Sequence, residues 1–254
     1  MNPVVEMREL AKAVKCTRSS DSTYQECLEQ YGFAVLELGG GEALSLEAIM
    51  QPLGEPVSYR FGAKLTMEQQ QGTDNSQFRT GAIPMHVDAI LNATDVSFIG
   101  MECIEAPVRG GETLIVRSEA FFAVAPSDLV DTLRNIEIEY WSNVSDFYIN
   151  HDGQNTIASP IRLDPVTGGE TLYLGVSYPQ DTTRNFGAAV VGYSDADSLS
   201  LFKELADVLN RPDVVYKHRW QVGQVLVLDN RRVLHGRQPY NANESRKLIR
   251  VSVV

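Results

Sequence analysis

The sequence predicts a mainly β protein, an antiparallel barrel or sandwich with helices packed outside it. From about Asp95 onward, short β-rich runs follow one another between turn residues, and helices do not alternate with them. That order favours antiparallel sheets over a parallel α/β sheet. The chain has 254 residues, of which 43% are apolar, which is enough for a sizeable core. We therefore expect one domain over residues 1–254.

The first fifty or so residues are predicted to form a helical flank beside one strand. Hydrophobic spacing indicates helices over 5–14 and 21–30, and the β-rich run GFAVLEL then begins at Gly32. The segment SLEAIMQPL has a third helical pattern, which Gly54 and Pro56 should end because neither residue continues a helix well.

The remaining strands are predicted from a series of β-rich runs interrupted by two helices. The runs are DVSFIGMECIEA, ETLIVR, IEIEYW, TLYLGV, VVYKHRW, QVLVLDN and KLIRVSVV. One helix is expected over 118–134 with a break at Pro126, and another over 194–210. In the second helix an apolar stripe, expected to lie on a sheet, is formed by Leu199, Phe202, Leu205 and Leu209.

Two polar segments are predicted to be loops. The segment 146–171 is rich in Asn, Asp, Gly and Pro, and we expect a long loop over one mouth of the barrel. The segment 65–81 is similarly polar and is a candidate lid.

Charge and cysteine content narrow the class of protein. The formal net charge of −11 repels phosphate backbones and anionic lipid, so we expect no nucleic-acid or membrane partner. No apolar run approaches the about 18 residues of a membrane helix. The three cysteines, Cys16, Cys27 and Cys103, include no Cys-x-x-Cys pair, which favours reduced thiols. Cys103 lies in a β-rich run and is expected in the core. A cytoplasmic protein is the expectation.

Three residues are candidate metal ligands, and two of them are histidines. His86 and Asp88 are two residues apart, so in an extended segment both side chains share one face and can converge on a metal ion. His235 follows a strong β run and could supply a third ligand from another strand. Two histidines and one carboxylate form the facial triad that suits non-haem Fe(II) and its oxygen chemistry. A catalytic zinc ion is the alternative.

Two arginines lie downstream of His235 in the run SRKLIRV. Arg246 and Arg250 are both even-numbered, so on a strand they share one face and can point inward. Unpaired cations inside a barrel are unfavourable, so the pair predicts a bound carboxylate. The alternative is an ion pair with an internal Asp or Glu such as Glu112.

These motifs together resemble one enzyme family. The matching residues are His86-x-Asp88, Gly110-Gly111-Glu112-Thr113-Leu114, the run from Asp229 to Arg237 around His235, and Arg246 with Arg250. From about Gly32 to its end, the chain resembles the taurine dioxygenase / clavaminate synthase-like family of Fe(II)- and 2-oxoglutarate-dependent oxygenases. The resemblance implies a double-stranded β-helix, or jelly roll, with flanking helices.

The resemblance also implies roles for individual residues. It makes His86, Asp88 and His235 the iron ligands, and it makes Arg246 and Thr113 the partners of the distal carboxylate of 2-oxoglutarate. Arg250 falls where the family holds an anionic group of the substrate or the inner side of the cosubstrate. No substrate-binding motif is recognisable between Tyr140 and Tyr193.

The expected activity follows from the presence of Asp88. Related halogenating enzymes have a small residue at this position, so here the resemblance implies hydroxylation, or else desaturation or ring closure, of a small molecule. The cosubstrates are 2-oxoglutarate and O2, the products include succinate and CO2, and the substrate is expected to be amino-acid-like or a specialised metabolite. The alternatives are a jelly-roll sensor that binds metal and 2-oxoglutarate without turnover, and a zinc hydrolase.

Other residues are candidates on weaker grounds. On position alone, Arg79 and Tyr59 are possible substrate contacts. Aromatic side chains that could line a pocket, or simply lie in the core, are Trp141, Phe147, Tyr148 and Tyr178. His151 is expected in a surface loop, and His218 at a solvated or edge position. Asp229 or Asn230 could hydrogen-bond to the ligands, or could serve only the turn in which they lie.

Overall fold

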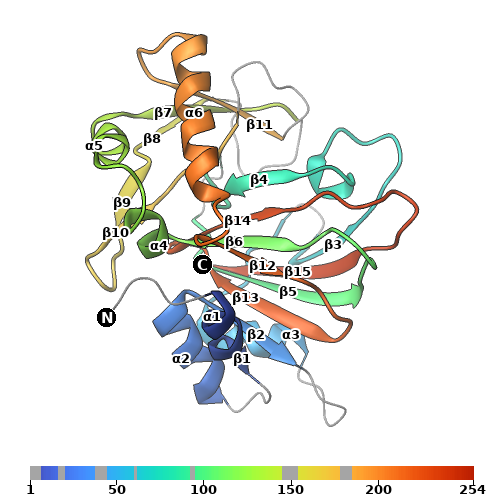
Figure 1. Ribbon diagram of the computed structural model, residues 1–254. Coiled ribbons are helices and arrows are strands. Elements are labelled where there is room, and N and C mark those ends of the chain that lie inside the picture. Colours follow the sequence, from blue (N-terminus) through green and yellow to red (C-terminus); the bar gives the residue numbers. More distant parts are fainter. Residues whose placement is uncertain are drawn as a thin grey trace.

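The computed structural model describes residues 7–16, 21–37, 45–59, 62–91, 95–144, 154–177 and 185–254. The largest element of this part of the chain is a six-stranded sheet, antiparallel except for its first pair (Figure 1). Across the sheet its strands are β1 (Lys15–Cys16), β2 (Phe33–Glu37), β13 (Gln224–Asp229), β5 (Phe98–Glu105), β15 (Lys247–Val253) and β3 (Lys64–Glu68).

A second, four-stranded sheet packs against the first. In order its strands are β12 (Val215–His218), β6 (Thr113–Arg117), β14 (Val233–Arg237) and β4 (Ile83–His86), all antiparallel. Beyond them lie three short strands, β11 (Phe186–Val190), β7 (Ile138–Ser142) and β8 (Thr156–Ala158), and a two-stranded pair, β9 (Ile161–Leu163) with β10 (Glu170–Leu172).

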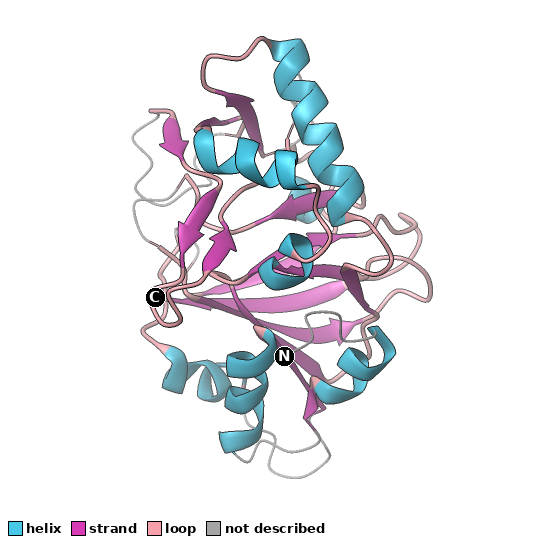
Figure 2. Ribbon diagram, turned by 60° about the vertical axis from the view of Figure 1, so that its left-hand side comes forward, coloured by secondary structure: helices cyan, strands magenta, loops and turns pink. Residues whose placement is uncertain are grey.

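Helices cover the outer faces of the two main sheets (Figures 1 and 2). At the N-terminal end are α1 (Met7–Ala13), α2 (Asp21–Tyr31), α3 (Leu46–Met50) and the 3-10 helix η1 (Gln51–Leu53). On the opposite side are α4 (Ser118–Phe122), α5 (Ser127–Asn135) and α6 (Asp195–Leu209), while the 3-10 helix η2 (Ser76–Phe78) follows β3. Pro126 is the N-cap of α5, as expected of the predicted break.

Strand alternation divides the hydrophobic core into layers. Along β13, Leu226 and Leu228 point between the two main sheets, where they pack with Ile115 from the second sheet. The alternate residues Val225 and Val227 point outward and pack with α2 and α3. A third layer joins the second sheet to α5, α6 and the short strands. This alternation leaves the space between the main sheets to side chains from both of them.

Most of the predicted elements are present; strands β1 and β11 lie outside every predicted run, and three predicted segments differ from the structure. In α6, Phe202, Leu205 and Leu209 are buried, but Leu199 is only half-buried and Leu201 is buried instead. The candidate lid at 65–81 begins with strand β3. The prediction of a long loop over 146–171 was wrong for the second part of this segment, which forms β8 and β9. These three-residue edge strands are too short and exposed to leave a hydrophobic pattern in the sequence.

None of the three cysteines, all of which lie in the described ranges, forms a disulfide, and Cys103 is a core residue with 1% of its surface exposed, as predicted. None of the helices in the described ranges is long and apolar enough to cross a membrane.

Candidate active site

The two candidate histidines lie on neighbouring strands. Strand β14 pairs with β4 so that His235 is directly opposite His86, and their ring centroids are 4.4 Å apart. Because the two residues form a cross-strand pair, both side chains lie on the same face of the sheet. That face is turned toward the six-stranded sheet.

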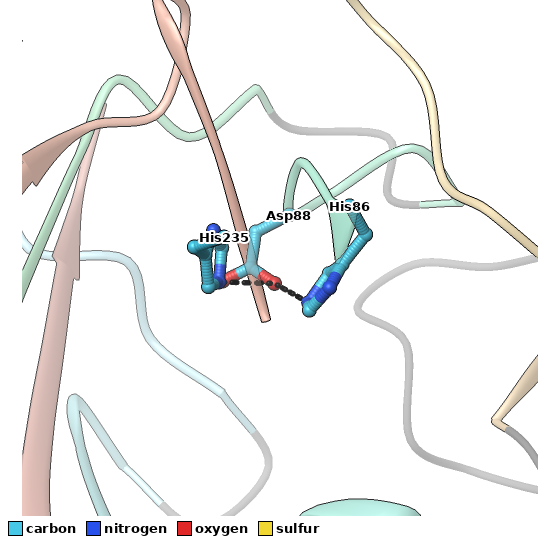
Figure 3. A group of neighbouring side chains, drawn as sticks. All are labelled: His86, Asp88 and His235. Carbon is cyan, nitrogen blue, oxygen red and sulfur yellow. Dashed lines mark ion pairs between the residues drawn. The ribbon is translucent and has the colours of Figure 1, made fainter. Parts of the chain in front are cut away.

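Asp88 completes the group just beyond the end of β4 (Figure 3). Its Oδ1 lies 3.4 Å from His86 Nε2 and 3.8 Å from His235 Nε2. The three candidate ligand atoms all lie within 4.8 Å of one another, and no other such group of three occurs in the described ranges. The sequence-predicted triad is therefore assembled in space.

The donor atoms of this triad suit a bound cation. His86 Nδ1 lies 2.8 Å from the carbonyl oxygen of Pro84, so Nδ1 is the donor there, and in the neutral ring Nε2 keeps a lone pair. That lone pair faces the Asp88 carboxylate, and two acceptors in contact need a positive charge between them. Two imidazoles and one carboxylate fit a ferrous ion that has further positions open to other ligands.

Arg250 and burial set the protonation of the group. Burial alone would raise the pKa of Asp88, but the Arg250 guanidinium and the contact with His86 outweigh it and hold that pKa well below its usual range. Arg250 Nη2 forms an ion pair with Asp88 Oδ2, and Arg250 Nε donates to Ser252 Oγ at 3.2 Å. Burial, with the charges of His86 and Arg250, lowers the pKa of His235 to about 3. At neutral pH the carboxylate is charged and His235 is neutral, as metal binding requires.

Arg246 and Thr113 form a second polar group in the same cavity. Arg246 is 6% exposed, and its Nε donates to the carbonyl of Gly111 at 3.0 Å. Gly111 has a φ of +69°, and a Cβ there would lie 3.0 Å from Arg246 Cδ, so glycine permits the close approach. Burial lowers the pKa of Arg246 to about 10, so the guanidinium stays charged at neutral pH, and within the described ranges the charges that act on it come from Tyr240 and Cys103 and from no carboxylate. A bound carboxylate would supply the missing charge.

Trp220 orients the hydroxyl group of Thr113. The indole Nε1 donates to Thr113 Oγ1 at 3.0 Å, and both residues are buried. Because the oxygen accepts this bond, the hydroxyl proton of Thr113 is free for another acceptor. Arg246 and Thr113 can thus both donate to one carboxylate.

The cavity extends from the triad toward an apolar wall. Its lining includes Ile90, Leu91, Ile99, Met101, Tyr140 and Phe186, in addition to the triad, Thr113 and the two arginines. The rings of Tyr140 and Phe186 meet edge to face, with centroids 6.0 Å apart. Gly175 lies between Phe186 and His86, since a Cβ there would be 2.6 Å from Phe186 Cζ and 3.4 Å from His86 Cβ. The aromatic wall therefore borders the triad.

Arg237 holds the segment 76–81 against this cavity. Its guanidinium donates to the carbonyl oxygens of Ser76 and Gln77 at 3.0 Å, of Gly81 at 2.7 Å, and of Arg79. Arg237 lies two residues after His235 on β14, so it points into the same space. The strand that carries one candidate ligand thus also fixes the rim of the cavity.

The weaker sequence candidates have varied positions. The side chain of Arg79 is exposed and does not line the cavity. Tyr59 Oη contacts Arg250 Nη2 at 3.4 Å. Trp141 packs over Gly187 and is not among the lining residues. Phe147, Tyr148, Tyr178 and His151 lie outside the described residues.

The prediction for His218 was half wrong. The residue is on β12, an edge strand as expected, but it is only 3% exposed, because its ring packs against Trp220.

For the two downstream arginines, the alternative to a bound carboxylate was an internal ion pair. That alternative applies to Arg250, whose partner is Asp88 and not Glu112. Residues of the site that had no role in the sequence analysis are Tyr140, Phe186, Trp220 and Arg237. Of these, only Arg237 carried a usable signal, because it ends the run around His235 that matches the family.

Comparison with known proteins identifies the family. Residues 9–252 match the model of the Taurine catabolism dioxygenase TauD, TfdA family. The chain belongs to this family. Members similar to it include enzymes described as α-ketoglutarate-dependent dioxygenases and as an Fe, α-ketoglutarate-dependent oxygenase. The chain is therefore an Fe(II)- and 2-oxoglutarate-dependent oxygenase that also uses O2, and it is not a zinc hydrolase.

Three similar proteins show how far the likeness extends. The oxygenase is 28% identical to 3-((Z)-2-isocyanoethenyl)-1H-indole synthase of Fischerella ambigua over 88% of its own length and 80% of that protein. It is 24% identical to the tyrosine isonitrile desaturase of Pseudomonas aeruginosa, over 87% and 75% of the two chains. The crystal structure of PvcB from Pseudomonas aeruginosa superposes with a TM-score of 0.69 at 22% identity, covering 90% and 78%.

Proposed function

We propose that this oxygenase acts on a small aromatic substrate derived from an amino acid and carrying an isonitrile group. The observation that carries the proposal is the wall formed by Phe186 and Tyr140, which places apolar aromatic surface beside His86. A flat apolar wall suits an aryl side chain held next to the triad. Three relatives aligned over 82–88% of this chain, which are named for isonitrile products or substrates, support the same substrate class.

The proposed outcome is desaturation of the substrate, and hydroxylation is the alternative outcome of the same oxidation. Two relatives are named desaturases, and the product of the third has an ethenyl group. In a desaturation the substrate loses two hydrogen atoms and one C–C bond becomes double, while 2-oxoglutarate and O2 become succinate, CO2 and water. The bound iron supplies this oxidising chemistry, and the protein supplies binding and orientation. The alternative of a sensor that binds metal and 2-oxoglutarate without turnover has no support among the comparisons.

The residue roles form part of the proposal. His86, Asp88 and His235 hold the iron, and Arg246 with Thr113 holds the distal carboxylate of 2-oxoglutarate. Arg250 keeps the Asp88 carboxylate oriented through its ion pair and faces the inner end of the cosubstrate. Arg79, with its exposed side chain, stays a predicted substrate contact that a variant must test.

The architecture supports a jelly-roll assignment. We infer that the two facing main sheets form a double-stranded β-helix over one domain, residues 1–254, since the family model spans 9–252 and solved relatives share the fold. Three cysteines without a disulfide suit the reducing cytoplasm, where we place the enzyme.

The test is a substrate panel with purified protein, Fe(II), 2-oxoglutarate and O2. The panel contains the isonitrile acids of tyrosine and tryptophan, the two parent amino acids, an aryloxyacetate and taurine, and both succinate and the product mass are measured. The proposal expects a product two hydrogen atoms lighter than an isonitrile acid, with or without loss of its carboxyl group as CO2, and stoichiometric succinate. Efficient oxidation of a parent amino acid, the aryloxyacetate or taurine, with no reaction of either isonitrile acid, would overturn it.

A further inference from the structure

The carboxylate ligand stands where regular strand pairing has ended. His86 is the last residue of β4 and is held by its partner His235, and the N–H of Val87 still donates to Leu174 at 3.0 Å. Asp88 lies in the turn that follows, so its peptide groups have no strand partner to fix them. Something else must hold the backbone of Asp88 if its carboxylate is to stay beside the histidines.

Asn230 provides that hold from the opposite turn. Its Oδ1 accepts from the Asp88 N–H at 2.8 Å, and its Nδ2 donates to the Asp88 carbonyl at 3.2 Å. The same Nδ2 donates to the Val96 carbonyl at 2.8 Å, and the Asn230 N–H donates to the Ser97 carbonyl at 2.9 Å. The side chain is 2% exposed, so these bonds do not compete with water. One amide therefore brackets both backbone groups of Asp88.

The backbone next to Asp88 is strained. Ala89 has a φ of +71°, and no other non-glycine residue in the described ranges has a positive φ. An alanine in this region is unfavourable and persists only where its surroundings enforce it. The hydrogen bonds from Asn230 to Asp88, the residue before Ala89, help to enforce this conformation. The strained turn directs the Asp88 side chain back toward His86 and His235 rather than along the strand.

We propose that Asn230 is a positioning residue for the carboxylate ligand of the iron site. It lies in the turn between β13 and β14, five residues before His235. The turn therefore leads into the strand that carries His235, and its Asn230 side chain holds the backbone of Asp88. Asn230 touches neither substrate nor cosubstrate in this role, so the inference is independent of the proposed substrate.

The experiment measures the affinity of the full-length, metal-free protein for Fe(II) alone, anaerobically, in competition with a chromophoric chelator. Asn230→Ala is expected to weaken Fe(II) binding by roughly 10- to 100-fold, the usual loss when a partner of a metal ligand is removed. The matched control is Ser198→Ala in α6, which removes another fully buried hydrogen bond, from the Val190 N–H to Ser198 Oγ at 3.1 Å. This control should lower the melting temperature without changing the Fe(II) affinity.

A second variant separates positioning from stability. Asn230→Ala combined with Ala89→Gly lacks the bonds from Asn230 but no longer carries the strain at position 89, because glycine accepts the positive φ. This double variant should recover melting temperature while its Fe(II) binding stays weaker than that of the wild type, and it decides the matter if Asn230→Ala does not fold. Wild-type Fe(II) affinity in Asn230→Ala, or in the double variant when the single variant is unfolded, would overturn the proposal. So would an equal loss of affinity in Ser198→Ala.

Discussion

The two ends of the cavity are built in different ways. The cosubstrate end consists of buried polar side chains, Arg246 and Thr113, on or beside strands of the two main sheets. The substrate end is formed by Phe186 and Tyr140, apolar rings on the small three-stranded sheet. The first end offers hydrogen-bond donors and a positive charge, and the second offers an apolar surface. Because different sheets carry them, the substrate end can change while the cosubstrate end and the triad stay as they are.

The triad is the point that both ends share, and its loss should have the largest effect. Asp88→Ala is expected to reduce succinate formation to background, because the carboxylate ligand is gone. It also leaves Arg250 buried without its anion, at a cost of about 3–5 kcal/mol in the free energy of unfolding. Activity is followed as succinate, and stability by denaturant unfolding.

A double variant separates these two effects. Asp88→Ala with Arg250→Met removes the unpaired charge and should recover most of the stability but none of the turnover. Substantial succinate from either variant would show that Asp88 is not needed as a ligand.

The next largest effect tests the charged end. Arg246→Ala should raise the KM for 2-oxoglutarate by roughly 10- to 150-fold, which corresponds to about 1.5–3 kcal/mol for hydrogen bonds to a charged group. The KM of Arg246→Lys for 2-oxoglutarate should lie between those of the wild type and Arg246→Ala, because lysine keeps the charge but lacks the planar guanidinium. Steady-state kinetics at saturating substrate measure the change. An unaltered KM for 2-oxoglutarate would remove Arg246 from its assigned role.

A smaller effect is expected at the apolar end. Phe186→Ala removes the ring that borders His86, so the KM for the organic substrate should rise about tenfold, as expected for 1–2 kcal/mol of lost apolar contact. The KM for 2-oxoglutarate should stay constant, because Phe186 lies on a different sheet from Arg246. Parallel changes in both constants would contradict the separation of the two ends.

The smallest effect on activity is expected at His218 beside the charged end, where the change appears instead in the pH dependence of the free energy of unfolding. Burial, with the charges of Lys15 and Arg246, lowers the pKa of His218 from 6.5 to about 4. As pH falls below 6.5 the unfolded chain takes up this proton first, so the stability contributed by neutral His218 is complete above pH 6.5 and is lost toward pH 4. The slope is about 1.4 kcal/mol per pH unit.

His218→Phe isolates this contribution in the metal-free protein. Denaturant unfolding between pH 7 and pH 4.5 should show a shallower pH dependence in the variant by the equivalent of one proton. Burial also lowers the pKa of His235, with the same sign, but that residue is present in both proteins and cancels in the comparison. Identical slopes for the two proteins would mean that His218 titrates normally in the fold.

The same contrast between the two ends explains what could be predicted from sequence. His86 and Asp88 share a face by simple alternation, and Arg246 and Arg250 do so on one strand, so the polar half of the site follows from local spacing. Phe186 and Tyr140 meet only because β11 pairs with β7, and β11 (FGAAV) is too small and apolar to be recognised as a strand. For Asn230 the sequence left open whether the side chain bonds to a ligand or serves only its own turn, because its contact with Asp88 joins residues 142 positions apart.

The central claim is that His86, Asp88 and His235 hold Fe(II) while Arg246 and Thr113 hold 2-oxoglutarate. Anaerobic titration of the metal-free protein with Fe(II) and then 2-oxoglutarate tests it directly, by the visible metal-to-ligand charge-transfer band of a chelated 2-oxo acid. The account predicts a saturable band in the wild type, no band in Asp88→Ala, and a band in Arg246→Ala only at much higher 2-oxoglutarate concentration. A wild-type protein that shows no band, or an Arg246→Ala titration that superposes on the wild type, would contradict it.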